Sequence, residues 1–171
     1  CHFEGLGLHT GAPVTVTVQS APADFGICFV RTDAARRPVY VNPFTAVSSD
    51  RCTALHENDV DIITPEHLLS ALAGLGIDNA AISINAPEVP ILDGSASAYV
   101  KAILADGLQT QNAPRKYYDV TETLHFQDEK TGADLVIELP AVYATTFPSF
   151  NSQRPYARKV TSLPSLIVMA P

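Results

Sequence analysis

The first part of the chain alternates between hydrophobic and polar positions, as a half-buried β-strand does. Val14, Val16 and Val18 are separated by threonines, which gives the period of two of such a strand. A turn at residues 22–26 then leads into a second apolar segment at residues 27–31. We therefore predict that these two strands pair with each other as a hairpin.

Two more short apolar segments follow a polar, proline-containing passage at residues 32–43. They lie on either side of Glu57, Asn58 and Asp59, which favour a turn, so a second pair of strands is expected here. A further strand is predicted at residues 80–85.

The segment TPEHLLSALAGLGIDN, which starts at Thr64, has the signals of a short helix. Thr64 is a suitable N-cap and Pro65 suits the first helical position, while Gly74 and Gly76 end the element. Its apolar stripe is formed by Leu68, Leu69, Leu72 and Leu75.

A second helix is predicted after the motif PILDGSA, in which a turn is followed by Ser95 as the cap. It is expected to end at Gly107. Its apolar face should consist of Tyr99, Val100, Ile103 and Leu104.

From Lys116 the strand-like pattern starts again, with a turn at residues 128–132 and a return strand at residues 135–139. The first of these strands should use Tyr118, Val120, Leu124 and Phe126. We accordingly divide the chain into a first domain (1–114), the first strands of a second domain (115–140) and an irregular, incomplete tail (141–171).

Composition narrows the class of partner. Of 171 residues, 46% are hydrophobic, enough for a sizeable core, and 18 acidic against 11 basic residues give a net charge of −7. This charge disfavours a nucleic-acid partner. The scattered arginines Arg31, Arg36, Arg37 and Arg51 are expected on a solvated face, although a small phosphorylated substrate could use one or two of them.

Cysteine usage indicates a reducing setting. Cys1, Cys28 and Cys52 are odd in number and have no CxxC spacing, and no secretory leader is visible, so we expect a cytoplasmic protein. No apolar run approaches the roughly 20 residues that cross a bilayer, so any membrane contact should be peripheral and transient. The chain also lacks an initiator methionine, which suggests a piece of a longer polypeptide.

Glu66 and His67 are the residues most able to carry chemistry. In the first turn of a helix, free N–H groups and the helix dipole favour an ionised glutamate and a neutral histidine. These are the forms that accept a proton from water and bind zinc. On the dipeptide alone, a helix-dipole role for Glu66 and a local hydrogen bond for His67 explain the pair better, because no HExxH spacing follows.

Three other residues are candidates for the same pocket. His9 lies in the glycine-rich segment GLGLHTG, where its imidazole could reach an anionic group, and a surface turn explains it about equally well. Cys52 and Thr53 precede a predicted strand just ahead of the helix and could line the pocket, although buried packing is commoner for such a cysteine.

Four motifs, in this order and approximate spacing, resemble the zinc-dependent UDP-3-O-(3-hydroxyacyl)-N-acetylglucosamine deacetylases of lipid A synthesis. They are GLGLHTG, RCTAL, TPEHLLSALAGLGIDN and NAPEVPILDGSASAYV. The resemblance is strong at residues 3–109 and looser to residue 139, where the sequence is similar to forms fused to an acyl-carrier-protein dehydratase.

The resemblance implies an α+β fold: a two-layer sandwich of a small, mostly antiparallel sheet and a pair of helices, followed by the start of a second, similar domain. It implies that His67 is a Zn²⁺ ligand and that Glu66 is the general base that activates water against the acetamide of UDP-acyl-N-acetylglucosamine. Cys52 matches a position beside the metal pocket.

The rest of the family's site has no match here. Its other zinc ligands, a histidine and an aspartate four residues apart, belong to the second domain, and the segment TTFPSF comes too early for the family's threonine-phenylalanine motif. The chain is therefore expected to carry part of a site that needs the missing domain. The alternative is a truncated, non-catalytic fragment or module of that enzyme.

Overall fold

The computed structural model describes residues 1–115, 121–130 and 132–137. The chain divides into two compact units, Cys1–Ala113 and Pro114–Pro171. The predicted strand positions Tyr118 and Val120 and the segment TTFPSF lie outside the described residues.

The first unit is built on a five-stranded sheet with the order β1-β2-β8-β3-β4. All neighbouring strands are antiparallel except β3 and β8, which are parallel. The strands are β1 (His2–Leu6), β2 (Pro13–Ser20), β3 (Ile27–Arg31), β4 (Pro38–Tyr40) and β8 (Ala80–Ile84).

The predicted hairpin of β2 and β3 is wrong, because β8 lies between them and pairs with both. Each strand forms where its alternation predicts it, but periodicity does not say which strand is its neighbour. Ala80, Ile82 and Ile84 of β8 are almost fully buried, so this later strand fills the centre of the sheet.

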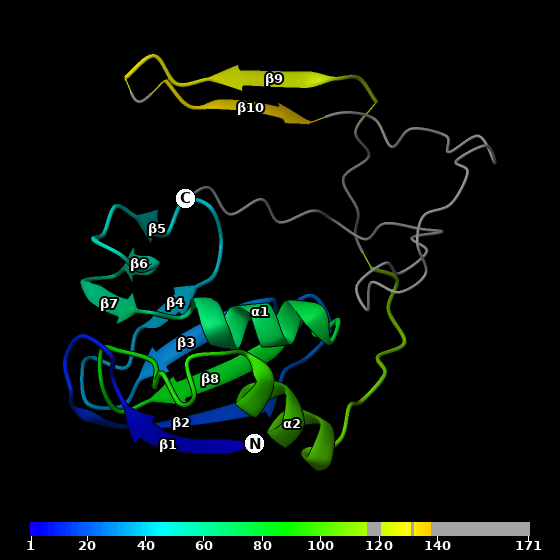
Figure 1. Ribbon diagram of the computed structural model, residues 1–171. Coiled ribbons are helices and arrows are strands. Elements are labelled where there is room, and N and C mark those ends of the chain that lie inside the picture. The colour runs from blue at the N-terminus through cyan, green and yellow to red at the C-terminus, as the bar shows by residue number, and fades with distance from the viewer. Residues whose placement is uncertain (116–120, 131, 138–171) are drawn as a thin grey trace, which may run out of the picture. The chain divides into compact units, whose positions relative to one another are not determined.

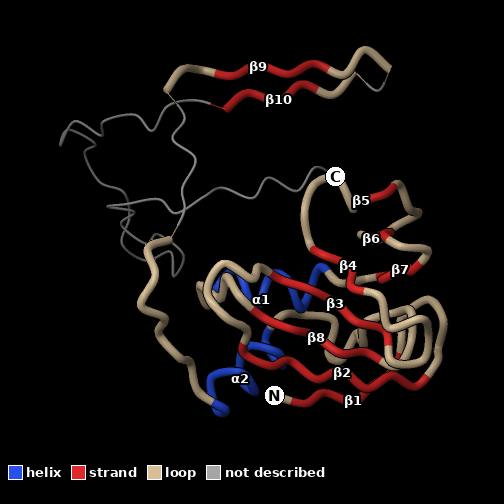
Figure 2. The backbone as a smooth tube through the Cα atoms, turned by 180° about the vertical axis from the view of Figure 1, so that it is seen from behind, coloured by secondary structure: helices blue, strands red, loops and turns tan. Residues whose placement is uncertain are grey.

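Helices α1 (Glu66–Gly74) and α2 (Ser97–Asp106) lie side by side on one face of the sheet (Figure 1), and the view from behind shows the opposite face uncovered by helices (Figure 2). Leu68 and Leu72 of α1 and Tyr99 of α2 are buried against the sheet. The unit therefore has the two-layer α+β architecture that the resemblance implies.

The helix details differ from the predictions at three positions. Thr64 is not the N-cap of α1, because its hydroxyl donates to a buried glutamate and Pro65 takes the N-cap position. Leu104 is 52% exposed, so it does not belong to the buried face of α2. Ser95 precedes the N-cap Ala96, but its Oγ accepts a hydrogen bond from the amide of Ser97, 3.0 Å away.

A three-stranded antiparallel sheet accompanies the main sheet in the first unit. It consists of β5 (Ala46–Val47), β6 (Ala54–Glu57) and β7 (Val60–Ile63). The predicted pairing of β6 and β7 is confirmed, and both turn residues between them, Asn58 and Asp59, have positive φ angles, as a tight hairpin turn requires.

The described part of the second unit is a hairpin. Its strands, β9 (Leu124–Gln127) and β10 (Asp134–Ile137), are antiparallel, as predicted. The amide of Gly132 donates to the carbonyl of Asp128 at 2.8 Å in the turn between them.

Candidate functional site

Glu66 and His67 are the first two residues of α1, and both side chains are half-buried. The backbone N–H of Thr53 donates to Oε2 of Glu66 at 3.3 Å. The structure thus brings together two of the predicted site residues, Thr53 immediately before β6 and Glu66 at the start of α1. Within the described residues, the other carboxylate oxygen of Glu66 accepts no hydrogen bond.

The turn before α1 is held from two sides. Thr64 has a φ of 58°, a backbone conformation that is costly for a β-branched residue. Its amide donates to the carbonyl of Thr53 at 2.9 Å, and its hydroxyl donates to Oε1 of Glu88 at 3.1 Å. These two bonds determine where the chain enters the helix that carries Glu66 and His67.

Glu88 is the functional candidate that sequence reasoning missed. Its side chain is almost fully buried, and it accepts hydrogen bonds from the amides of His9 and Thr10, at 2.9 and 2.8 Å, and from the Thr10 hydroxyl at 2.7 Å. Burial alone would raise the pKa of Glu88, but these donors, with Thr64, outweigh it and lower the pKa below its usual value. The available signal was a lone acidic residue in the apolar segment PEVP.

The backbone amide of His9 donates a hydrogen bond to the Glu88 carboxylate, while the His9 side chain is exposed. Cys52 is half-buried beside Thr53, and its Sγ lies 3.6 Å from the Ser49 hydroxyl. The structure therefore connects His9 to the turn before α1 through Glu88, and Cys52 to it only through its neighbour in sequence.

The described part of the chain meets neither the requirements of a metal-binding group of three side chains nor those of a membrane-spanning helix. No three His, Cys, Asp or Glu side chains gather there into a metal-binding group. Among the same residues, no helix has the length and apolar character needed to cross a membrane. Among the described residues, the His67 imidazole therefore lacks the two companion side chains that a catalytic zinc site requires.

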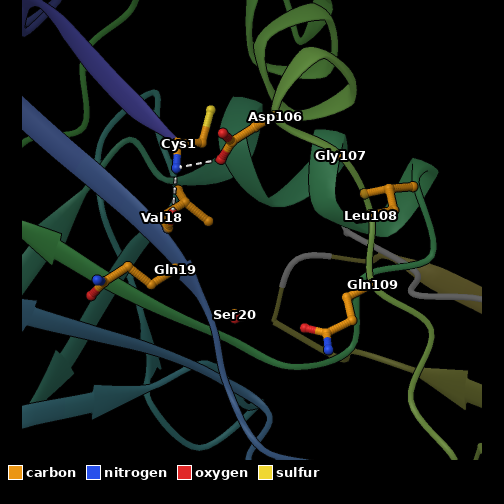
Figure 3. Close-up of a pocket in the computed structure, with 8 residues that line it drawn as sticks. All are labelled: Cys1, Val18, Gln19, Ser20, Asp106, Gly107, Leu108 and Gln109. Carbon is orange, nitrogen blue, oxygen red and sulfur yellow. Dashed lines mark hydrogen bonds and ion pairs between the residues drawn. The ribbon is translucent and has the colours of Figure 1, made fainter.

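A surface pocket lies at the C-terminal end of α2 (Figure 3). The amino group of Cys1 forms an ion pair with Asp106 there, with a distance of 2.9 Å. The pocket contains none of the predicted site residues; it is lined by Cys1, Val18, Gln19, Ser20, Asp106, Gly107, Leu108 and Gln109.

Curated relatives of this chain are deacetylases. The chain is 46% identical over 135 residues to the UDP-3-O-acyl-N-acetylglucosamine deacetylase of Shewanella halifaxensis, covering 77% of this chain and 44% of the relative. It is 44% identical over 126 residues to that of Cellvibrio japonicus, covering 72% and 41%. The Legionella pneumophila (strain Corby) enzyme is 45% identical over 127 residues, covering 72% and 41%.

The chain thus spans less than half the length of these relatives. Its residues 1–160 match the sequence profile of the LpxC family, described as UDP-3-O-acyl N-acetylglycosamine deacetylase. Since this match extends over most of the chain, the protein belongs to the LpxC family of UDP-3-O-acyl N-acetylglycosamine deacetylases.

Proposed function

We propose that this chain supplies part of the active site of a zinc-dependent enzyme that hydrolyses the N-acetyl group of UDP-3-O-acyl-N-acetylglucosamine, the committed step of lipid A synthesis. Family membership and the names of the relatives support the reaction. The observation that carries the proposal is the pairing of Glu66 and His67 in the first turn of α1, half-buried and next to the Thr53 amide.

Glu66 is the proposed general base. Its Oε2 is held by the Thr53 amide, and its Oε1 accepts no hydrogen bond among the described residues, so one oxygen orients the carboxylate and the other can take a proton from the attacking water. The N-terminal end of α1 favours the negative charge that this role requires.

His67 is the proposed metal ligand, through its neutral imidazole. When bound, zinc supplies a Lewis acid for the water and for the acetamide oxygen. The described residues provide one of the three protein ligands expected at such a site, so the remaining two must come from elsewhere in the complete enzyme.

His9, Cys52 and Thr53 are proposed to line the substrate pocket. Thr53 has the strongest support, because its amide contacts Glu66 directly. Any contact of the enzyme with a membrane surface is proposed to be transient. Cys1, Cys28 and Cys52 are free thiols, which supports a reducing, cytoplasmic setting.

A non-catalytic module is the second candidate. It is favoured by the lack of a three-ligand metal group among the described residues. Zinc analysis of the 171-residue chain after dialysis tests this candidate: stoichiometric zinc with acetate release by this chain alone would reject the module.

The test of the proposed function is a chimera in which this chain replaces the matching part of the Shewanella halifaxensis deacetylase. We expect the zinc-loaded chimera to release acetate from UDP-3-O-acyl-N-acetylglucosamine. His67→Asn should lower both zinc content and turnover, and His56→Asn, an exposed histidine paired with Asp61, is the matched control. Turnover and zinc that are unchanged in His67→Asn would reject the assignment.

A further inference from the structure

We propose that Glu88 is a positioning residue that holds the His9 loop (residues 7–11) against the turn at Thr64, which leads into the helix that begins with Glu66 and His67. This inference rests on the proposed function, because it assigns Glu88 a role toward the proposed site. Glu88 does not contact the reacting atoms in this proposal. It acts through the backbone of His9 and through Thr64.

The two carboxylate oxygens of Glu88 divide the contacts between them. Oε1 accepts from the His9 amide at 2.9 Å and from the Thr64 hydroxyl at 3.1 Å, and thereby joins the loop to the turn. Oε2 accepts from the amide and hydroxyl of Thr10, at 2.8 and 2.7 Å, and shares the His9 amide at 3.2 Å. None of these donors is a cation, so the buried charge is stabilised only by hydrogen bonds from these two segments.

The His9 loop is shaped around this carboxylate. A Cβ atom at Gly7 would lie 2.4 Å from Oε2 of Glu88 and 2.3 Å from Oγ1 of Thr10, closer than real Cβ contacts allow. The glycine in this motif is therefore required by the close approach of the loop backbone to Glu88. The loop can pack against the Glu88 carboxylate only because residue 7 has no side chain.

The segment that carries Glu88 is also fixed to the end of β7. The amide of Ile63 donates to the carbonyl of Pro87 at 2.8 Å, and the amide of Val89 donates to the carbonyl of Ile63 at 2.9 Å. Glu88 therefore has little backbone freedom, and it can restrain the strained Thr64 immediately after Ile63. Strain held by surrounding contacts in this way is typical of functional sites.

Glutamine cannot replace Glu88 without loss. An NH₂ group at the Oε2 position removes the acceptor of the Thr10 amide. An NH₂ group at the Oε1 position removes the acceptor of the Thr64 hydroxyl and leaves the His9 amide only its longer contact with the other oxygen, at 3.2 Å. Glu88→Gln thus weakens the link between the loop and the turn while it keeps the size of the side chain.

The first measurement is amide hydrogen exchange by NMR on the 171-residue chain. In Glu88→Gln we expect exchange at His9 and Thr10 to accelerate by at least about tenfold. The amides of Val16 and Ile82, in the centre of the sheet, serve as internal controls and should change much less. Equal acceleration at all four amides, or none at His9, would overturn the positioning role.

A second pair of variants keeps Glu88 in place and so guards against a loss of folding. Thr64→Val removes the hydroxyl and preserves the branched shape, and Thr64→Ser preserves the hydroxyl. In the chimera, Thr64→Val should lower kcat about tenfold or more with a smaller change in KM, because the reacting groups are misplaced. Thr64→Ser should restore most of the loss, and equal kcat values in the two variants would overturn the proposal.

The two proposals fail in different ways. If the unsubstituted chimera released no acetate while the parental Shewanella enzyme did, the proposed function would fail, and amide exchange in the 171-residue chain would still decide the role of Glu88. If the chimera were active and neither Glu88→Gln nor Thr64→Val changed exchange or kcat, the positioning role alone would fail.

Discussion

Glu66 and Glu88 lie close to the same turn of the chain, yet their surroundings are opposite. Glu88 is almost fully buried and accepts hydrogen bonds from two amides and two hydroxyls. Glu66 is half-buried and accepts one, from the Thr53 amide at 3.3 Å. A carboxylate whose lone pairs are all engaged stabilises structure, whereas one with a free oxygen can take part in proton transfer.

The difference shows how one small region can hold both a carboxylate that stabilises the structure and a carboxylate that is free to exchange a proton. In the proposed site, the fully hydrogen-bonded carboxylate of Glu88 restrains the backbone, and the carboxylate of Glu66, with one oxygen that accepts no hydrogen bond among the described residues, lies at the helix start, where the dipole favours its charge. Stability and chemistry should therefore respond to different substitutions, and the following predictions separate them.

The largest effect on stability is expected from Gly7→Ala, which removes the space for the Glu88 carboxylate without touching Glu66. The new methyl group would displace Glu88 or Thr10, so unfolding in urea should show a loss of about 3 kcal/mol. Gly74→Ala is the matched control: its Cβ meets nothing within 4 Å at the end of α1, so it should be neutral or stabilising by up to about 1 kcal/mol. Equal effects of the two alanines would contradict the close fit at Gly7.

Acid should weaken the Glu88 region selectively. Because hydrogen bonds lower the pKa of Glu88 in the folded state below its usual value of 4.5, its contribution to stability is complete above that pH and is lost as the pH falls through the lower, folded value. The free energy of unfolding of the parent chain should thus fall more steeply below pH 4.5 than that of Glu88→Gln.

Asp33 is the control for this pH dependence, because its pKa is also lowered, chiefly by its hydrogen bond with Arg31. Its side chain is partly exposed, so Asp33→Asn should change the acid dependence less than Glu88→Gln does. A parent chain and a Glu88→Gln variant with parallel pH dependence would show that Glu88 is not held as a carboxylate.

A smaller effect is expected at Tyr99, which contacts the segment containing Glu88 at Pro90. Its buried hydroxyl donates to the carbonyl of Pro90, and its ring lies 4.8 Å from that of Phe3. Tyr99→Phe keeps the ring and removes the donor, so chemical denaturation should show a loss of about 1 kcal/mol. A variant as stable as the parent would mean that this bond is not needed to hold the segment.

Much of this arrangement follows from local sequence. Alternation at Val14, Val16 and Val18 predicted a strand, and the turn residues Asn58 and Asp59 predicted the β6–β7 hairpin, because both signals depend only on neighbouring residues. Glu66 and His67 were likewise found from their place at a helix start, and the structure puts both there.

The remaining features depend on residues distant in sequence. The neighbour of β2 is β8, and alternation within a strand carries no information about its partner. Thr64 has the chemistry of an N-cap, but a buried carboxylate that is 24 positions later in the sequence takes its hydroxyl. Glu88 collects donors from His9, Thr10 and Thr64, so its role becomes visible only when three segments are assembled.

The most direct test of the central claim is turnover by the zinc-loaded chimera carrying Glu66→Gln, with zinc content and unfolding free energy measured on the same sample. We predict that acetate release falls by about 10²–10⁴-fold while zinc content stays the same and stability changes by less than about 0.5 kcal/mol. Glu4→Gln, at an exposed position of β1, should leave all three unchanged. Parental turnover in Glu66→Gln would contradict the assignment of this carboxylate as the base.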